Sequence, residues 1–93
     1  MSETPEEKMT RYIARFMGGV PHLKQLGIVY RAHGDDWAEM ELPYAPHLIA
    51  YPDSGVIASG AIFSLMDSVC GFSVTAAQRK WEPIATLDLR VDY

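Results

Sequence analysis

The sequence is poor in the residues that cross-link a chain or attract a polyanion. Cys70 is its one cysteine, which excludes an intramolecular disulfide. The 8 Lys and Arg residues are scattered and are outnumbered by 12 Asp and Glu, which gives a formal net charge of −4. Because a nucleic-acid surface needs clustered basic side chains to neutralise phosphates, nucleic acid is not an expected partner.

Low-complexity tracts, internal repeats and a recognisable targeting segment are lacking as well. The first residues, MSETPEEK, have neither the basic nor the apolar region of a secretory signal, so we expect a cytoplasmic location. The chain has 93 residues, of which 48% are hydrophobic and 22% charged. This composition predicts one small globular domain over 1–93.

The stretch 55–78, GVIASGAIFSLMDSVCGFSVTAAQ, is the most apolar part of the chain, and Asp67 is its only charged residue. A helix that is apolar nearly all round is expected to be buried. It is long enough to raise the question of a membrane span, but Asp67, several serines and the absence of a basic cluster at its start favour a core helix. We therefore predict a long central helix and no membrane partner.

Helical spacing separates this predicted helix into a bulky side and a strip of small residues. Gly60, Ser64, Asp67 and Gly71 fall on one strip, which lets another segment approach the helix backbone closely. A carboxylate in poorly hydrated surroundings costs several kcal/mol unless it is paired, hydrogen-bonded or protonated. Asp67 is therefore either satisfied by the fold or used for function.

A second helix is predicted near the N-terminus, within 1–20. Thr4 can cap it, Pro5 fits its first position, and Glu7 suits a capping box. Apolar residues then recur every three or four positions until Gly18 and Gly19 interrupt the helix. This apolar stripe is expected to lie on another surface.

Three strands are predicted, and so few strands make a small sheet. Segments 27–32 and 37–42 are rich in β-formers and flank the turn residues 33–36, which indicates an antiparallel hairpin. Segment 84–93 alternates polar and apolar residues, which is typical of a third strand. Three strands cannot cover so apolar a helix, so we expect either further chain or a second chain to supply the missing cover.

Several short motifs follow one another at a defined spacing. The first is the segment 21–28, PHLKQLGI, which is followed by Tyr51-Pro52 and Ala58-Ser59-Gly60. Leu65-Met66-Asp67 and Gly71 come next, and Thr86-Leu87-Asp88-Leu89 is the last. The pattern resembles the hotdog-fold acyl-CoA thioesterases of the phenylacetyl-CoA thioesterase (PaaI-like) group. That family has an Asn or Asp before Pro, a His-Gly-Gly triplet, a Leu-x-Asp-x-x-x-Gly segment and a Ser/Thr-x-Asp-Leu strand in this order.

The resemblance implies an α+β hotdog fold and a thioesterase site. In this family an antiparallel sheet curls around the long helix, and two units pair through their sheets; the last strands would be missing here. Asp67 falls on the catalytic general base or nucleophile, Thr86 on the hydroxyl that places the water, and Ser59 on the backbone N–H that receives the oxyanion. Gly60, Ser64 and Tyr51 are expected to contact the substrate.

The same resemblance implies that an acyl-CoA is the partner, with coenzyme A as part of the substrate and no separate cofactor. The spacing of Ser59 and Asp67 along the helix also predicts an oligomer. Ser59 and Asp67 lie eight residues apart, which is about 12 Å along a helix axis and too far for both to act on one thioester carbon. A working site would combine Ser59 of one subunit with Asp67 of another, so we expect a homodimer or homotetramer.

Two departures from the family pattern favour an alternative. Ala58 stands where the family has His, and Tyr51 where it has Asn or Asp. The alternative hypothesis is a non-catalytic hotdog module that binds acyl-CoA or serves in assembly. A hotdog dehydratase or hydratase is less well supported, because no Asp-to-His pair at short spacing follows the helix start.

Other candidate residues have simpler interpretations. Cys70 has no histidine nearby in sequence and is interpreted as an inert buried thiol. His22, His33 and His47 are isolated, and no pair has metal-ligand spacing, so no metal is expected. Ser59 lacks the Gly-x-Ser-x-Gly elbow of a serine nucleophile. The apolar stripe of the N-terminal helix is interpreted as packing, or alternatively as a lid over an acyl pocket.

Overall fold

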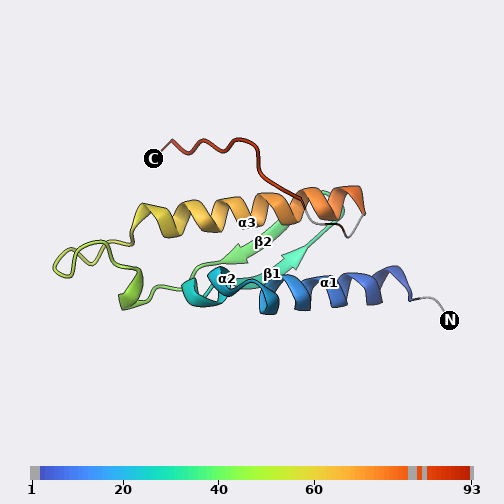
Figure 1. Ribbon diagram of the computed structural model, residues 1–93, viewed down its shortest axis with the longest axis horizontal. Helices are drawn as coiled ribbons and strands as arrows, with labels where there is room; N and C mark the ends of the chain where they lie inside the picture. Colours follow the sequence, from blue (N-terminus) through green and yellow to red (C-terminus); the bar gives the residue numbers. More distant parts are fainter. Residues whose placement is uncertain (1–2, 80–81, 83, 93) are drawn as a thin grey trace.

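The computed structural model describes residues 3–79, 82 and 84–92. The protein is an α+β chain in two layers, with two long helices lying over a β-hairpin (Figure 1). The two helices run roughly antiparallel to each other. The elements, in chain order, are α1 (Pro5–Gly19), α2 (Pro21–Leu26), β1 (Val29–His33), β2 (Ala38–Glu41), a short 3₁₀ helix η1 (Pro46–Leu48) and α3 (Ser59–Gln78).

Helix α1 begins with the cap that its sequence predicts. The Thr4 Oγ1 atom accepts the backbone N–H of Glu7 at 3.2 Å, and Pro5 opens the helix, where its missing N–H costs nothing. Glu6 and Glu7 place negative charge at the positive end of the helix dipole. Local signals therefore account for where α1 starts.

Helix α2 follows directly, in a segment for which the sequence predicts no defined secondary structure. Pro21 opens it, and Gly27 closes it in the left-handed conformation, with φ of 81°. The Gly27 N–H donates to the carbonyls of Leu23 and Lys24 at 3.0 and 3.1 Å. Glycine suits this position because it adopts positive φ without a Cβ clash.

The hairpin matches the predicted antiparallel pair but is shorter. Tyr30 faces Met40 and His33 faces Ala38, with a register shift between Tyr30 and Ala32. The turn is closed by the Gly34 N–H, which donates to the carbonyl of Trp37 at 2.9 Å. The indole of Trp37 lies so close to Gly34 that a Cβ atom at this position would clash with it.

The core forms where α1, α3 and one face of the hairpin meet. Phe72 of α3 is fully buried, and its ring centroid lies 5.7 to 6.0 Å from those of four other rings. These rings are contributed by α1 and β1 and belong to Tyr12, Phe16, Tyr30 and His33. The predicted apolar stripe of α1 is therefore used for packing.

Two expectations for the stretch 55–78 are corrected. The helix begins at Ser59, because residues 55–58 form a loop in which Gly55 has φ of 68° and Ile57 bridges to Ile49. The helix is also not buried all round, since the hairpin and α1 cover only one side of it. Its buried residues are Ala61, Phe72, Thr75 and Ala76.

The predicted third strand does not form within the described residues 84–92. This segment leaves the end of α3 and runs back along it without joining the hairpin (Figure 1). Alternation of polar and apolar residues makes a strand only when a neighbouring strand accepts its backbone hydrogen bonds. Leu87, on the apolar side of the predicted strand, is fully exposed as a result.

Candidate functional site

The strip of small residues on α3 is contacted by parts of the chain that are distant in sequence. At its centre, the hydroxyl of Thr86 donates a hydrogen bond to Oδ1 of Asp67 at 2.5 Å. Asp67 is half-buried, and Thr86 reaches it from the C-terminal segment, 19 residues further along the chain. The structure thus brings together two of the residues predicted to be catalytic.

Gly71, one turn beyond Asp67, explains how the C-terminal segment comes so close. A Cβ atom at Gly71 would lie 3.3 Å from Cδ1 of Ile84, tighter than most such contacts. The absence of a side chain at Gly71 therefore lets Ile84 lie against α3. Thr86 follows two residues later and meets the same strip at Asp67.

The N-terminal half of the strip is contacted by α2. Nε2 of His22 lies 3.1 Å from Oγ of Ser64, and this Oγ also donates to the carbonyl of Gly60 at 2.9 Å. In the sequence His22 is isolated, and no spacing motif connects it with a residue 42 positions away. Only the folded structure, in which the side chain of His22 reaches α3, reveals this contact.

Ser59 and Gly60 open helix α3, and Gly60 is the first residue of the strip. Ser59 is the first residue of α3, and its N-cap Ala58 offers no side-chain hydrogen bond. A Cβ added at Gly60 would meet nothing within 4 Å, so space is open beside this part of the helix. Ser59 and Asp67 sit on one continuous helix, which fixes their separation along its axis at about 12 Å.

Tyr51 is not brought to the rest of the predicted site. It lies in the loop between η1 and α3, which projects beyond the start of α3 in Figure 1. Its side chain is 71% exposed. The predicted substrate contact of Tyr51 is therefore separated from Asp67 within one chain.

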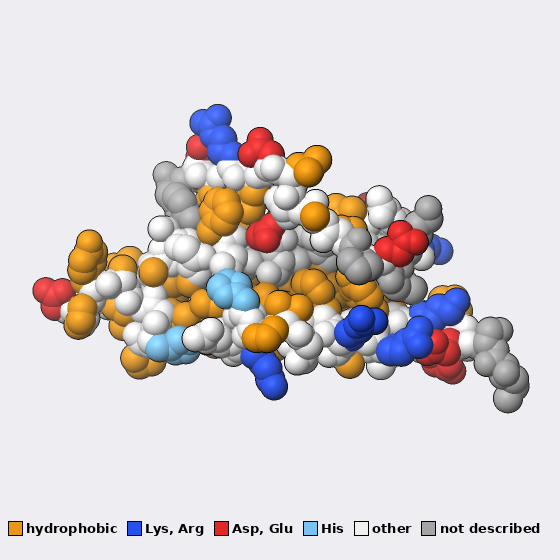
Figure 2. All heavy atoms as spheres, in the orientation of Figure 1, with side chains coloured by type: hydrophobic (Ala, Val, Ile, Leu, Met, Phe, Trp, Pro, Cys, Tyr) orange, Lys and Arg blue, Asp and Glu red, His pale blue; other side chains and the backbone are white. Residues whose placement is uncertain are grey.

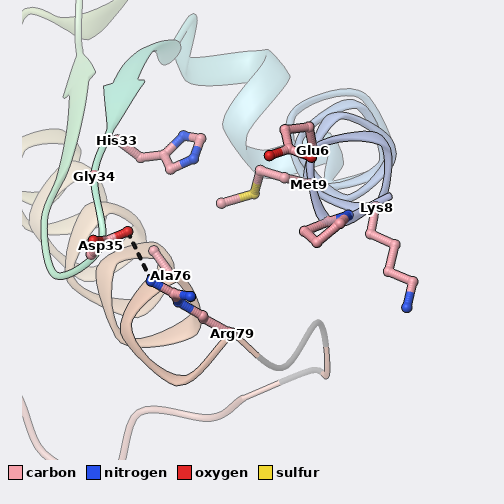
Figure 3. A pocket seen from close by; sticks show the side chains of 9 residues that line it. Glu6, Lys8, Met9, His33, Gly34, Asp35, Ala76 and Arg79 are labelled. Carbon is pink, nitrogen blue, oxygen red and sulfur yellow. Dashed lines mark ion pairs between the residues drawn. The ribbon is translucent and has the colours of Figure 1, made fainter. Parts of the chain in front are cut away.

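A cleft among the described residues lies elsewhere. It has a volume of about 590 Å³ and opens between the start of α1, the hairpin turn and the end of α3. Figure 3 shows Met9 pointing into it, while Asp35 and Arg79 form an ion pair of 3.2 Å at its edge. Asp67 does not line this cleft.

One side of α3 carries apolar residues that the rest of the described chain does not cover. Phe63 is 38% exposed and Val74 is 45% exposed, and Cys70 between them is exposed as well. This corrects the expectation that Cys70 is buried. Figure 2 shows hydrophobic side chains reaching the surface along the middle of the molecule, with Lys and Arg mainly toward its edges. We call Phe63, Cys70, Val74 and Ala77 the open face of α3.

Helix α3 is also long and apolar enough to cross a membrane, by length and composition alone. The core helix of a soluble protein meets the same criterion, and α3 contributes Phe72 and Ala76 to the core with α1 and the hairpin. Among the described residues, no group of three or more His, Cys, Asp or Glu side chains is arranged to hold a metal ion. The expected absence of a membrane partner and of a cofactor remains a prediction.

No known family, curated protein or solved structure matches this chain in sequence or structure comparisons. A function for the chain is therefore inferred from its sequence pattern and from the contacts that gather along the strip on α3.

Proposed function

We propose that the protein is an acyl-CoA thioesterase built on a hotdog-type arrangement. The observation that supports this proposal best is the hydrogen bond from Thr86 to Asp67. The sequence resemblance assigns these two residues to one catalytic site, and the contact arises although the segment carrying Thr86 is not a strand. A carboxylate with a hydroxyl beside it, on an accessible strip of small residues, suits activation of a water molecule.

In the proposed reaction, Asp67 accepts a proton from water, and the water oxygen attacks the thioester carbonyl. Attack by Asp67 itself, giving an acyl-enzyme, is the other route open to this carboxylate. Thr86 donates to Oδ1 of Asp67 and so orients the carboxylate. The backbone N–H of Ser59, at the positive end of α3, is the proposed donor to the developing oxyanion.

The proposed site requires a second copy of the chain. Two groups about 12 Å apart on one helix cannot both reach a single carbonyl, whose attacking atom and oxyanion donor each lie about 3 Å away. Ser59 of one protomer would therefore act with Asp67 of its partner. The acyl group would lie in a pocket at this interface.

The open face of α3 favours assembly. The apolar side chains of Phe63 and Val74 are exposed there, and a contiguous exposed apolar patch is typical of a surface that another chain covers.

Hydrolysis is tested with purified protein, a panel of acyl-CoAs and a thiol reagent that detects free CoA. We expect Asp67→Asn to lower turnover by about 100-fold or more, because the amide cannot accept a proton from water. Asp53→Asn makes the same chemical change in an exposed loop and should retain parental turnover. Equal rates for Asp67→Asn and the parent would refute the proposal.

A non-catalytic module that binds acyl-CoA or serves in assembly is the second candidate. Two observations favour it: Ala58 provides no imidazole at the start of α3, and Tyr51 lies away from the site in an exposed loop. The same assay separates the two candidates. Saturable binding of an acyl-CoA without release of CoA would support the module and exclude the thioesterase.

A further inference from the structure

The hydroxyl of Ser64 has a defined direction. It lies on the same strip as Asp67, one helical turn earlier, and donates its hydrogen to the carbonyl of Gly60 at 2.9 Å. A hydroxyl has one hydrogen to donate, so it accepts in its second contact, with Nε2 of His22 at 3.1 Å. His22 is therefore the donor, with its hydrogen on Nε2.

This arrangement leaves the Ser64 oxygen able to accept but not to donate. A hydroxyl oxygen accepts two hydrogen bonds, and His22 occupies one of these positions. The remaining lone pair is available, since Ser64 is only half-buried. Asp67 likewise accepts from Thr86 at Oδ1 and retains further capacity to accept.

Two acceptors at this spacing suit one water molecule. Residues three apart on a helix have Cβ atoms about 5–6 Å apart, so a water between them can donate one hydrogen to each side chain. With both hydrogens held, its lone pair is directed away from the helix, toward a bound carbonyl. A freely rotating Ser64 hydroxyl could instead donate its hydrogen to the water oxygen. That hydrogen bond would occupy a lone pair of the water and turn it away from the carbonyl.

We propose that Ser64 is the second acceptor for the attacking water and that His22 is the positioning residue that keeps Ser64 in its accepting orientation. This inference rests on the proposed thioesterase function. One water hydrogen passes to Asp67 as the water oxygen bonds to the carbonyl carbon. The carbon–sulfur bond then breaks, the thiolate takes the proton from Asp67, and the second water hydrogen leaves on the acid product.

A double-mutant cycle tests the roles of Ser64 and His22 in hydrolysis of one acyl-CoA. We expect Ser64→Ala to lower kcat about tenfold with little change in KM, which corresponds to one hydrogen bond lost in the transition state. His22→Phe should cost as much, and the double variant no more than either single change. His22→Gln should restore most of kcat, because its amide can donate from the same place.

Three results would overturn the inference. They are parental kcat in Ser64→Ala, effects of His22→Phe and Ser64→Ala that multiply, and a His22→Gln variant as slow as His22→Phe. If any of these occurs while Asp67→Asn still abolishes hydrolysis, the thioesterase proposal stands and only the role of Ser64 falls. A parent protein without hydrolysis would overturn both.

The donor assignment has a readout that does not depend on turnover. Nitrogen-15 NMR of the imidazole should show neutral His22 protonated at Nε2, and Ser64→Ala should shift the Nε2 resonance while leaving that of His47 unchanged. Nε2 of His47 donates to the carbonyl of Gln25 at 2.9 Å and serves as the internal control. A neutral His22 protonated at Nδ1 alone would contradict the assignment.

Discussion

Ile84 lies against Gly71, with its Cδ1 atom 3.3 Å from the position of a Cβ on that glycine. This contact holds the C-terminal segment close to α3, and Thr86 meets Asp67 one turn toward the start of the helix. The Ile84–Gly71 contact and the Thr86–Asp67 hydrogen bond thus lie one helical turn apart on the same strip of α3. Removing the Thr86 hydroxyl should therefore lower the turnover rate.

Thr86→Val should lower kcat about tenfold, because valine keeps the shape of threonine but removes the hydrogen bond to Asp67. Thr86→Ser retains the hydroxyl and is the matched control, expected to stay within about twofold of the parent. Steady-state release of CoA measures both. Equal kcat values for the valine and serine variants would remove Thr86 from the mechanism.

Phe72→Ala should destabilise the fold more than other single truncations. The ring is fully buried against four other rings, and deleting it leaves a cavity as well as lost burial, at about 3–5 kcal/mol. Urea unfolding monitored by circular dichroism measures the loss. Leu87→Ala, at a fully exposed position, should change the unfolding free energy by less than about 0.5 kcal/mol. Similar midpoints for the two variants would contradict the assignment of Phe72 to the core.

Tyr30 should make the fold sensitive to alkaline pH. Desolvation by burial raises the pKa of its phenol above the ordinary value of 10.0. The unfolded chain therefore loses this proton first, so the stabilisation is complete below about pH 10 and is lost as pH rises through the folded pKa. The difference in unfolding free energy between the parent and Tyr30→Phe should be constant below about pH 9 and shrink above about pH 10. A difference that does not change with pH would contradict this expectation.

The open face of α3 should mediate assembly. Light scattering should give the parent at least twice the mass of one chain, and Phe63→Glu combined with Val74→Glu should reduce it to a single chain, because burying two carboxylates in an apolar interface is costly. Leu87→Glu is the control, since that residue is fully exposed on the C-terminal segment. A folded monomeric parent would refute the shared site. If the two glutamates leave the oligomer intact, the interface is formed by another surface, such as the edges of the hairpin.

The sequence predicts most of the secondary structure because the relevant signals are local. Thr4 and Pro5 specify the start of α1, the β-formers around Gly34 specify the hairpin, and helical spacing places Ser64, Asp67 and Gly71 on one strip. The sequence also indicates that so small a sheet leaves α3 partly uncovered. These properties depend on near neighbours in the chain, which is why they can be predicted without coordinates.

The contacts that build the candidate site depend on packing between distant segments. Alternation alone predicts a strand at 84–93, but the described residues 84–92 join no neighbouring strand, and Ile84 lies against Gly71 instead. His22 of α2 meets Ser64 of α3 across 42 positions of the chain. Such contacts reflect the balance of packing over the whole chain, so no local pattern encodes them. Helical periodicity therefore specifies which side chains share the strip on α3, whereas the folded arrangement specifies which distant groups reach it.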